Sequence, residues 1–464
     1  MTPTGQRRGR SKTALSYLSA GCCFLVVALS LPALCGPKLP NLQSVKTSRN
    51  LRIAEDAPAR KDIVAAINAF REFEDDREEG PSLKAVISRL ENAAVRASKT
   101  PQLYYYLGIA YQYAEKYPRA KSRLERAIKL NPDFYEAYTE YADVFQWQKD
   151  YKQAIEQYDV ALDLNPEYDV ALERKSYALI RLGKFEEAKN LVEKAQEIDE
   201  KEKREPLLRR LNMALKGPSW EETFVCETDN FIVKTSVSNR LAERLGEAAE
   251  SIRRAYTKVF PKTKRPDRKF LVLVHNSRRE YVRNGGPRQA GGHYEPDFRI
   301  LQLFKYPKHD DTVAVLNHEA FHQFIHDYIE RAPQWFNEGV ADYFGAFEYR
   351  QNRERVVPRP NSDRLRVIKS AIRRKICPPP TDLMLMTQAE MYDPKMAGIY
   401  YAQAWSLVYF MLEGKKPRYR RVLSGYFRAL LKGKDIEEAY KQTFAKINMK
   451  RFEREWKSFT NSIQ

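Results

Sequence analysis

Two stretches of the sequence decide how its C-terminal half folds and what it can bind: NHEAFH at residues 317–322 and PQWFNEGVADYF at residues 333–344. In a helix, residues four apart project from the same face, so the imidazoles of His318 and His322 can hold one metal ion together. Glu319 lies on the adjoining edge of that face, where its carboxylate can act on water at the metal. This spacing predicts a helix that carries two zinc ligands and a general base.

The second stretch supplies the remaining features of such a site. Glu338 follows His322 after fifteen intervening residues, on a second predicted helix. Zinc in hydrolases takes three protein ligands and keeps one position open for water, so Glu338 completes the set. Asp342 shares the helical face of Glu338, and metal-bound histidines usually donate their second N–H to a carboxylate. We expect this role for Asp342 rather than an exposed aspartate, and we expect His326 at the surface rather than as a fourth ligand.

Residues 101–202 repeat with a period of thirty-four residues. Eight positions that alternate large and small residues agree between the first two units, and a third unit keeps most of them without the final proline. In the first unit these positions are Tyr104, Leu107, Gly108, Tyr111, Ala120, Leu124, Ala127 and Pro132. The pattern resembles tetratricopeptide repeats, in which each unit is a helical hairpin with small residues where its helices approach. We expect an all-α solenoid over residues 61–216, including a degenerate capping hairpin at 62–98 and a closing helix at 203–216.

The character of the sequence changes after Trp220, where apolar segments typical of strands appear. The predicted elements are strands at 224–235, 270–275 and 299–304, the second of them central, a helix at 240–260, and a turn at 291–296. In the metal-binding helix, we expect Asp310 or Asp311 to be the N-cap and Ala332-Pro333 to end the helix. Strands followed by mainly helical structure indicate an α+β domain over residues 217–464.

The paired motifs resemble those of gluzincin zinc metallopeptidases, most closely the bacterial peptidase-MA-like domains, which are often exported and attached to tetratricopeptide repeats. The likeness extends from about Phe224 to Gly414, and its specific part is residues 318–342. It implies a zincin-like fold with one Zn²⁺, ligands His318, His322 and Glu338, and Glu319 as the general base. The gap of fifteen residues is shorter than in the best-known gluzincins, so the loop between the two helices must be tight.

The same resemblance implies a donor for the oxyanion that develops when a peptide bond is attacked. Tyr401 fits this role best, because the helix around it resembles the helix that follows the zinc site in peptidase-MA-like domains. That helix is aromatic throughout, so a packing role for Tyr401 stays open. Tyr400 and His293 are the alternative donors.

Residues 1–36 are typical of an export signal, because four basic residues precede a mostly apolar run from Ala14 to Cys35. The run is also long enough to remain as a membrane anchor, so both alternatives stay open. Residues 37–60 are polar and aperiodic, as expected of a linker. We therefore expect an exported protein, periplasmic or secreted, in which Cys226 and Cys377 either form a disulfide or remain as two unpaired buried thiols.

The formal net charge of +19 raises the question of an anionic partner. Lysine and arginine are scattered among 61 acidic residues, without an aromatic-interleaved basic module or a glycine-rich phosphate loop, so no nucleic-acid partner is expected and a solvated basic surface is favoured. The densest basic cluster is Lys415, Lys416, Arg418, Arg420 and Arg421.

The leading hypothesis is an exported zinc metallopeptidase that hydrolyses peptides or proteins and uses its repeats to bind a partner or substrate. One alternative is an interaction scaffold with a catalytically silent metallopeptidase-like domain. Another is a different zinc hydrolase, acting for example on cell-wall peptides or amidated glycans.

Overall fold

The computed structural model describes residues 60–75, 80–261, 268–329, 332–350 and 355–464. The predicted signal or anchor, and the linker up to residue 59, lie outside these ranges. Within them, no helix combines the length and the apolar character needed to cross a bilayer. Cys226 and Cys377 are free, so of the two alternatives for this pair the unpaired thiols are correct, although both side chains are half-buried rather than buried.

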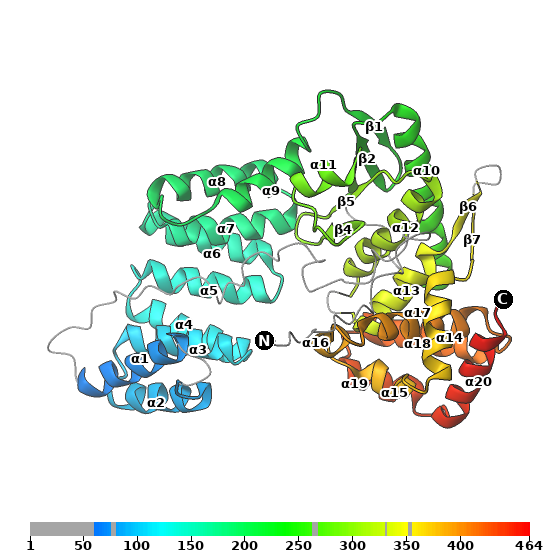
Figure 1. The fold of residues 1–464 in the computed structure, drawn as a ribbon. Coiled ribbons are helices and arrows are strands. Elements are labelled where there is room, and N and C mark those ends of the chain that lie inside the picture. Colours follow the sequence, from blue (N-terminus) through cyan, green and yellow to red (C-terminus); the bar gives the residue numbers. More distant parts are fainter. Residues whose placement is uncertain (1–59, 76–79, 262–267, 330–331, 351–354) are drawn as a thin grey trace, which may run out of the picture.

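The N-terminal half is a stack of antiparallel helical hairpins (Figure 1). Its helices are α1 (Arg60–Asp75), α2 (Leu83–Arg96), α3 (Pro101–Tyr113), α4 (Tyr117–Leu130), α5 (Tyr135–Trp147), α6 (Tyr151–Leu164), α7 (Asp169–Leu182), α8 (Phe185–Ile198) and α9 (Glu205–Lys216). A Cβ added to Gly108 would lie 2.4 Å from Cγ of Leu124, so this small residue permits the close approach of α3 and α4. The three repeat units, the capping hairpin and the closing helix are therefore present as the periodicity predicts.

A five-stranded sheet follows, with strand order β1-β2-β3-β5-β4. The strands are β1 (Phe224–Glu227), β2 (Phe231–Thr235), β3 (Phe270–His275), β4 (Gly292–Glu295) and β5 (Ile300–Phe304). The three inner strands are parallel and the two edge strands antiparallel, and β3 is central as its apolar sequence predicts. Helix α10 (Asn239–Val259) connects β2 to β3 and packs on the sheet, and the short α11 (Arg278–Arg283) follows β3.

Two predictions about this sheet are wrong in detail. Residues 224–235 form two antiparallel strands instead of one, because residues 228–230 turn the chain. The segment predicted as a turn at 291–296 contains β4, and the chain reverses after it, at residues 296–299. Arg299 has φ 57° there, a left-handed conformation that is uncommon for a residue other than glycine. Gly292 thus begins an edge strand, and Gly291 immediately precedes it.

The rest of the chain is helical apart from one hairpin. The elements are α12 (His309–His326), α13 (Gln334–Gly345), β6 (Glu348–Arg350), β7 (Arg355–Val357), α14 (Ser362–Arg373), α15 (Pro380–Leu385), α16 (Gln388–Met391), α17 (Ala397–Glu413), α18 (Pro417–Leu431), α19 (Ile436–Phe444) and α20 (Met449–Ser462). Helix α12 packs against α10, β4 and β5, and α13 lies between α12 and α17. The chain is thus a tetratricopeptide-like helical solenoid followed by a mixed α/β region.

The ends of α12 differ from the sequence prediction. Its N-cap is Lys308, which makes no side-chain capping bond, and the helix begins at His309. Asp310 and Asp311 lie inside the first turn, where their negative charge favours the positive end of the helix dipole without capping it. The helix ends at His326, before the Ala332-Pro333 step that was expected to stop it.

The closing helix and last repeat of the solenoid pack directly on the sheet (Figure 1). Leu207 and Leu211 belong to one buried apolar cluster with Leu273 of β3 and Ile300 of β5. The solenoid therefore buries part of its apolar surface against the sheet as well as within its own repeats. Two ion pairs flank the cluster, Arg181–Asp297 at 3.0 Å and Arg210–Glu295 at 3.0 Å. The solenoid is therefore fixed to the side of the sheet formed by β3, β5 and β4.

Candidate metal centre

Helices α12 and α13 bring the three predicted ligands together. One turn of α12 separates His318 and His322, whose Nε2 atoms are 3.2 Å apart. Glu338 of α13 places Oε2 3.7 Å from Nε2 of His318 and 3.9 Å from Nε2 of His322. All three ligand atoms lie within 4.8 Å of one another, and the carboxylate and His318 are buried.

These separations fit a tetrahedral zinc ion. Zinc with nitrogen and oxygen ligands at about 2.0–2.1 Å separates its ligand atoms by roughly 3.3 Å. The His318–His322 distance of 3.2 Å matches this value, and the two distances to Glu338 exceed it by a few tenths of an ångström. Two imidazoles and one carboxylate are also the ligand types that catalytic zinc sites use with a fourth position left open.

A hydrogen bond from outside the cluster orients each ligand. Asp342 places Oδ1 3.2 Å from Nδ1 of His318, as predicted from its position four residues after Glu338. Nδ1 of His322 lies 3.0 Å from Oδ1 of Asn337, and Nε2 of Gln334 donates to Oε1 of Glu338 at 2.8 Å. Both imidazoles thus turn Nε2, and the carboxylate turns Oε2, toward one point.

A further residue, Arg364 of α14, supports this arrangement. Its Nε donates to Oδ2 of Asp342 at 2.7 Å, and both side chains are buried. Burial alone would raise the pKa of Asp342, but the charge of Arg364 holds this pKa below its ordinary value. Asp342 therefore stays ionised, which is the form that best accepts a hydrogen bond from His318.

The pKa values of the ligands themselves are displaced in opposite directions. Burial lowers the pKa of His318, but Asp342 more than offsets this and raises it to about 9. Burial and the neighbouring His318 charge lower the pKa of His322 to about 4, and burial raises that of Glu338 to about 7. A divalent cation at this point would compete with protons for the imidazole nitrogens, so metal affinity should depend on pH.

Glu319 lies against the edge strand of the sheet. Its side chain is 9% exposed, and a Cβ added to Gly292 of β4 would approach its Cγ to 3.1 Å. The same added atom would lie 2.9 Å from the side chain of Val315, so a larger residue at position 292 would displace α12 or the carboxylate. The glycine thus allows β4 to run alongside the helix that carries the ligands.

The three candidate oxyanion donors lie in different surroundings. Tyr401 is fully buried, and its ring packs against the Arg364 guanidinium at 5.3 Å, so its position supports the packing role. His293 lies in β4 with Nδ1 2.8 Å from the hydroxyl of Tyr281, and its Nε2 faces Glu295 at 3.3 Å. Tyr400 is half-buried on α17.

His326 is half-buried rather than at the surface, because its ring packs edge-on against Tyr294 at 5.9 Å. It lies outside the cluster of three ligands.

Asn337, Gln334 and Arg364 were not predicted from the sequence. Gln334 lies four residues before Glu338, so helical spacing could have identified it as a neighbour on the ligand face. Asn337 is adjacent to Glu338 in the motif. Arg364 follows Asp342 by twenty-two residues on another helix, and no local pattern in the sequence connects the two.

Sequence families match both parts of the chain. Residues 105–169 and 147–210 match tetratricopeptide repeat families, which confirms the prediction for the solenoid. Residues 312–427, which include the whole candidate centre, match a family described as a protein of unknown function, DUF1570. No curated protein sequence matches the chain.

Solved structures of tetratricopeptide proteins are similar to part of the chain. The first tetratricopeptide domain of Spaghetti (RPAP3), solved with an HSP90 peptide, is 25% identical and covers 25% of this chain and 94% of that chain, with a TM-score of 0.25. MamA from Desulfovibrio magneticus RS-1 is 21% identical and covers 34% and 86%, with a TM-score of 0.29. A thermophilic tetratricopeptide protein from Thermus thermophilus, TTC0263, is 12% identical and covers 34% and 83%, with a TM-score of 0.30. Because these TM-scores are low, the assignment rests on the sequence families and the helical hairpins.

Proposed function

We propose that this chain is a zinc-dependent hydrolase of peptide bonds, of the gluzincin type, whose repeats bind a protein partner or present the substrate. The observation that carries the proposal is the convergence of Nε2 of His318, Nε2 of His322 and Oε2 of Glu338 on one point. A separate hydrogen bond orients each of these groups, which is how metal-binding residues are normally held.

In this mechanism, His318, His322 and Glu338 hold the metal. Zinc, when bound, supplies Lewis-acid chemistry by polarising a carbonyl group and lowering the pKa of water toward neutrality. Glu319 takes a proton from the attacking water and passes it to the leaving amine. Asp342 keeps Nδ1 of His318 protonated, which leaves Nε2 free for the metal. Gly292 keeps the edge strand close to Glu319, where a peptide substrate would have to lie.

A second candidate function is that of a protein-interaction scaffold. The two tetratricopeptide family matches favour it, because these repeats commonly form extended binding surfaces. The attachment of α9 to the sheet through Arg210 and Glu295 is compatible with either function, since it only orients the repeats relative to β4.

The decisive variant is Glu319→Gln, which keeps the size and hydrogen bonding of the side chain but removes its basicity. Zinc-loaded full-length protein should contain one zinc per chain and cleave members of a broad peptide library. Glu319→Gln should keep the zinc and lose about a hundred- to ten-thousand-fold in rate. Glu437→Gln is the matched control, because Glu437 is exposed on α19 and pairs only with Lys441 among the described residues.

The outcomes separate the two candidate functions. A wild-type chain that stays metal-free after exposure to zinc would exclude the hydrolase. One equivalent of zinc without cleavage of any peptide would favour the scaffold with a metal-stabilised domain. Equal cleavage by the wild type and Glu319→Gln would exclude Glu319 as the base.

A further inference from the structure

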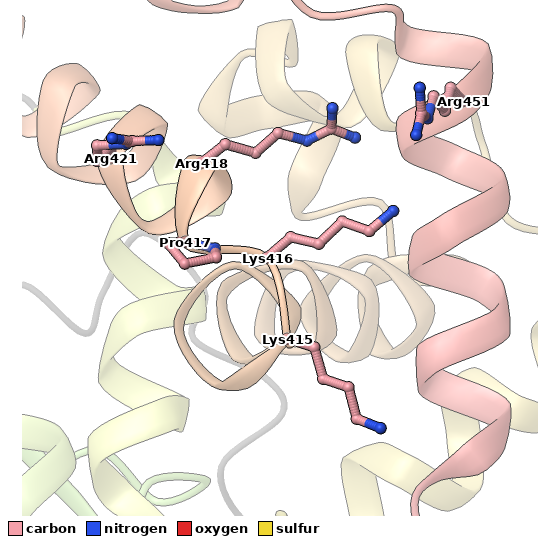
Figure 2. Close-up of a pocket in the computed structure, with 6 residues that line it drawn as sticks. All are labelled: Lys415, Lys416, Pro417, Arg418, Arg421 and Arg451. Atoms are coloured by element: carbon pink, nitrogen blue, oxygen red, sulfur yellow. The ribbon is translucent and has the colours of Figure 1, made fainter.

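A basic cavity lies at the junction of α17 and α18, where α20 packs beside them (Figure 2). Its volume is about 310 Å³, and its lining consists of Lys415, Lys416, Pro417, Arg418, Arg421 and Arg451. The first five belong to the loop and first turns that lead into α18, and Arg451 comes from α20. The sequence pattern favoured a solvated basic surface for this cluster. In the structure, four of its five cations lie with Arg451 around one open pocket, and all of these except Arg418 are exposed.

The charges around the cavity are strongly unbalanced. Glu455 is the carboxylate that pairs with its lining cations among the described residues, at 2.7 Å from Lys416, 3.1 Å from Arg418 and 2.8 Å from Arg451. Partial burial raises the pKa of Glu455, but hydrogen bonds from Lys416, Arg451 and Tyr419 hold it below its ordinary value. Five cations therefore share one ionised carboxylate, which leaves four positive charges uncompensated at neutral pH.

Three of the cationic side chains approach one another and two lie apart. Lys416 and Arg418 extend toward the helix that carries Arg451, and all three pair with Glu455. Lys415 points away from them, and Arg421 lies on the side of Arg418 away from Arg451 (Figure 2). Arg418 is held in place by Tyr419, whose hydroxyl lies 2.7 Å from its guanidinium, and its Nε is shielded without a hydrogen-bond partner among the described residues. Pro417 occupies the first position of α18, and its N-cap Lys416 makes no side-chain capping bond. The positive end of this helix therefore adds to the field of the cations.

We propose that this cavity binds a phosphate-class oxyanion, either a free phosphate or the phosphate of an anionic lipid headgroup. Arginine presents N–H groups in a planar fork that matches phosphate oxygens, and several cations on one small cavity suit a compact, multiply charged anion. The volume lies at the lower end of the 300–1,000 Å³ that is roughly typical of ligand pockets. Among the residues that the structure describes, no aromatic ring lines it on which a base could stack, which disfavours single-stranded nucleic acid.

This site is separate from the proposed metal centre. Its lining residues include no metal ligand and none of the groups that orient the ligands. Binding at the cavity therefore does not require that the chain is a hydrolase, and it can be measured whether or not peptide cleavage is found.

The test is calorimetric titration of the zinc-loaded full-length protein with inorganic phosphate at low salt, alongside flotation with phosphatidylcholine vesicles that do or do not contain phosphatidylglycerol. The double variant Lys415→Gln/Arg421→Gln removes two cations that have no ion pair among the described residues, so the Glu455 pairs stay intact. It should weaken binding at least about tenfold, since each unit charge at contact distance in water contributes roughly a factor of five. Glu455→Gln should tighten phosphate binding about fivefold, because it removes the carboxylate that competes with phosphate for the cations.

The matched control is Lys201→Gln/Lys203→Gln, which removes the same charge from two exposed lysines between α8 and α9. It should bind like the wild type. Phosphate binding that the Lys415/Arg421 variant weakens identifies free phosphate as the ligand source, and vesicle binding with the same dependence identifies a lipid headgroup. The proposal would be overturned if neither phosphate nor vesicles bound, or if the Lys415/Arg421 variant bound as well as the wild type. It would also be overturned if an oligoglutamate peptide bound in place of phosphate.

Discussion

Asp342→Asn should weaken zinc binding more than its conservative size suggests. In the wild type, Oδ1 of Asp342 faces Nδ1 of His318 at 3.2 Å, while Oδ2 accepts from Nε of Arg364 at 2.7 Å. Asparagine retains the shape but replaces one oxygen with an NH₂ group. One of the two donors must then face another donor, whichever way the amide turns.

The structure sets the size of two expected effects of Asp342→Asn, the loss of zinc affinity and the loss of folding stability. Loss of a carboxylate that orients a metal-bound histidine typically costs 10–100-fold in affinity, about 1.4–2.7 kcal/mol. Asp342 is 3% exposed, so water cannot replace the lost hydrogen bond and the upper half of this range applies. Arg364 is 8% exposed and loses its charge partner, which costs folding stability of about 3–5 kcal/mol even without metal.

The assay is a zinc titration in competition with a chromophoric chelator, together with thermal melts of the zinc-free and zinc-loaded forms. Asp342→Asn should raise the dissociation constant about 30–100-fold and should lower Tm even in zinc-free protein. The control is Asp159→Asn, because Asp159 is half-exposed and pairs with Lys175 at the surface of the solenoid. A dissociation constant within about threefold of the wild type would refute the role of Asp342 in orienting His318.

Three further predictions concern the packing around the site. Gly339→Ala should lower the free energy of unfolding by about 1–3 kcal/mol in chemical denaturation, because its Cβ would lie 2.7 Å from the backbone oxygen of Ala404; an unchanged midpoint would mean that α13 and α17 are farther apart. A fragment of residues 60–216 should melt at a lower temperature than the same helices in the full chain, measured by circular dichroism, because α9 loses its contacts with the sheet; equal melting would contradict the shared core. Burial alone would raise the pKa of Glu295, but His293 and Arg210 lower it to about 2. The ionised Glu295 should therefore add about 3 kcal/mol to the free energy of unfolding above pH 4.5, and this stabilisation should be lost as the pH falls toward 2. Glu295→Gln should remove this part of the pH dependence of stability. If the free energy of unfolding changed with pH equally in Glu295→Gln and the wild type, the ion pairs of Glu295 would be excluded as the source of that dependence.

The features that the sequence predicted correctly are those that depend on residues near one another along the chain. The thirty-four-residue period predicts the hairpins because each helix pair packs through residues of its own unit, such as Gly108 against Leu124. Helical periodicity alone places His318 beside His322, and Asp342 one turn after Glu338, so one close approach of two neighbouring helices completes the cluster.

The tertiary structure decided what depends on surfaces distant in sequence. Residues 291–296 look like a turn because of their glycines, yet Gly292–Glu295 form a strand because they pair with the free edge of β5. Gly292 is needed there because Val315 and Glu319 leave no room for a larger residue. Arg364 reaches Asp342 only because α14 packs against α17, which in turn packs against α13. Leu207 and Leu211 serve as an interface because β3 and β5 present apolar side chains to them. The periodicity of a helix indicates which of its faces is apolar, but the surface that covers this face is set by long-range packing.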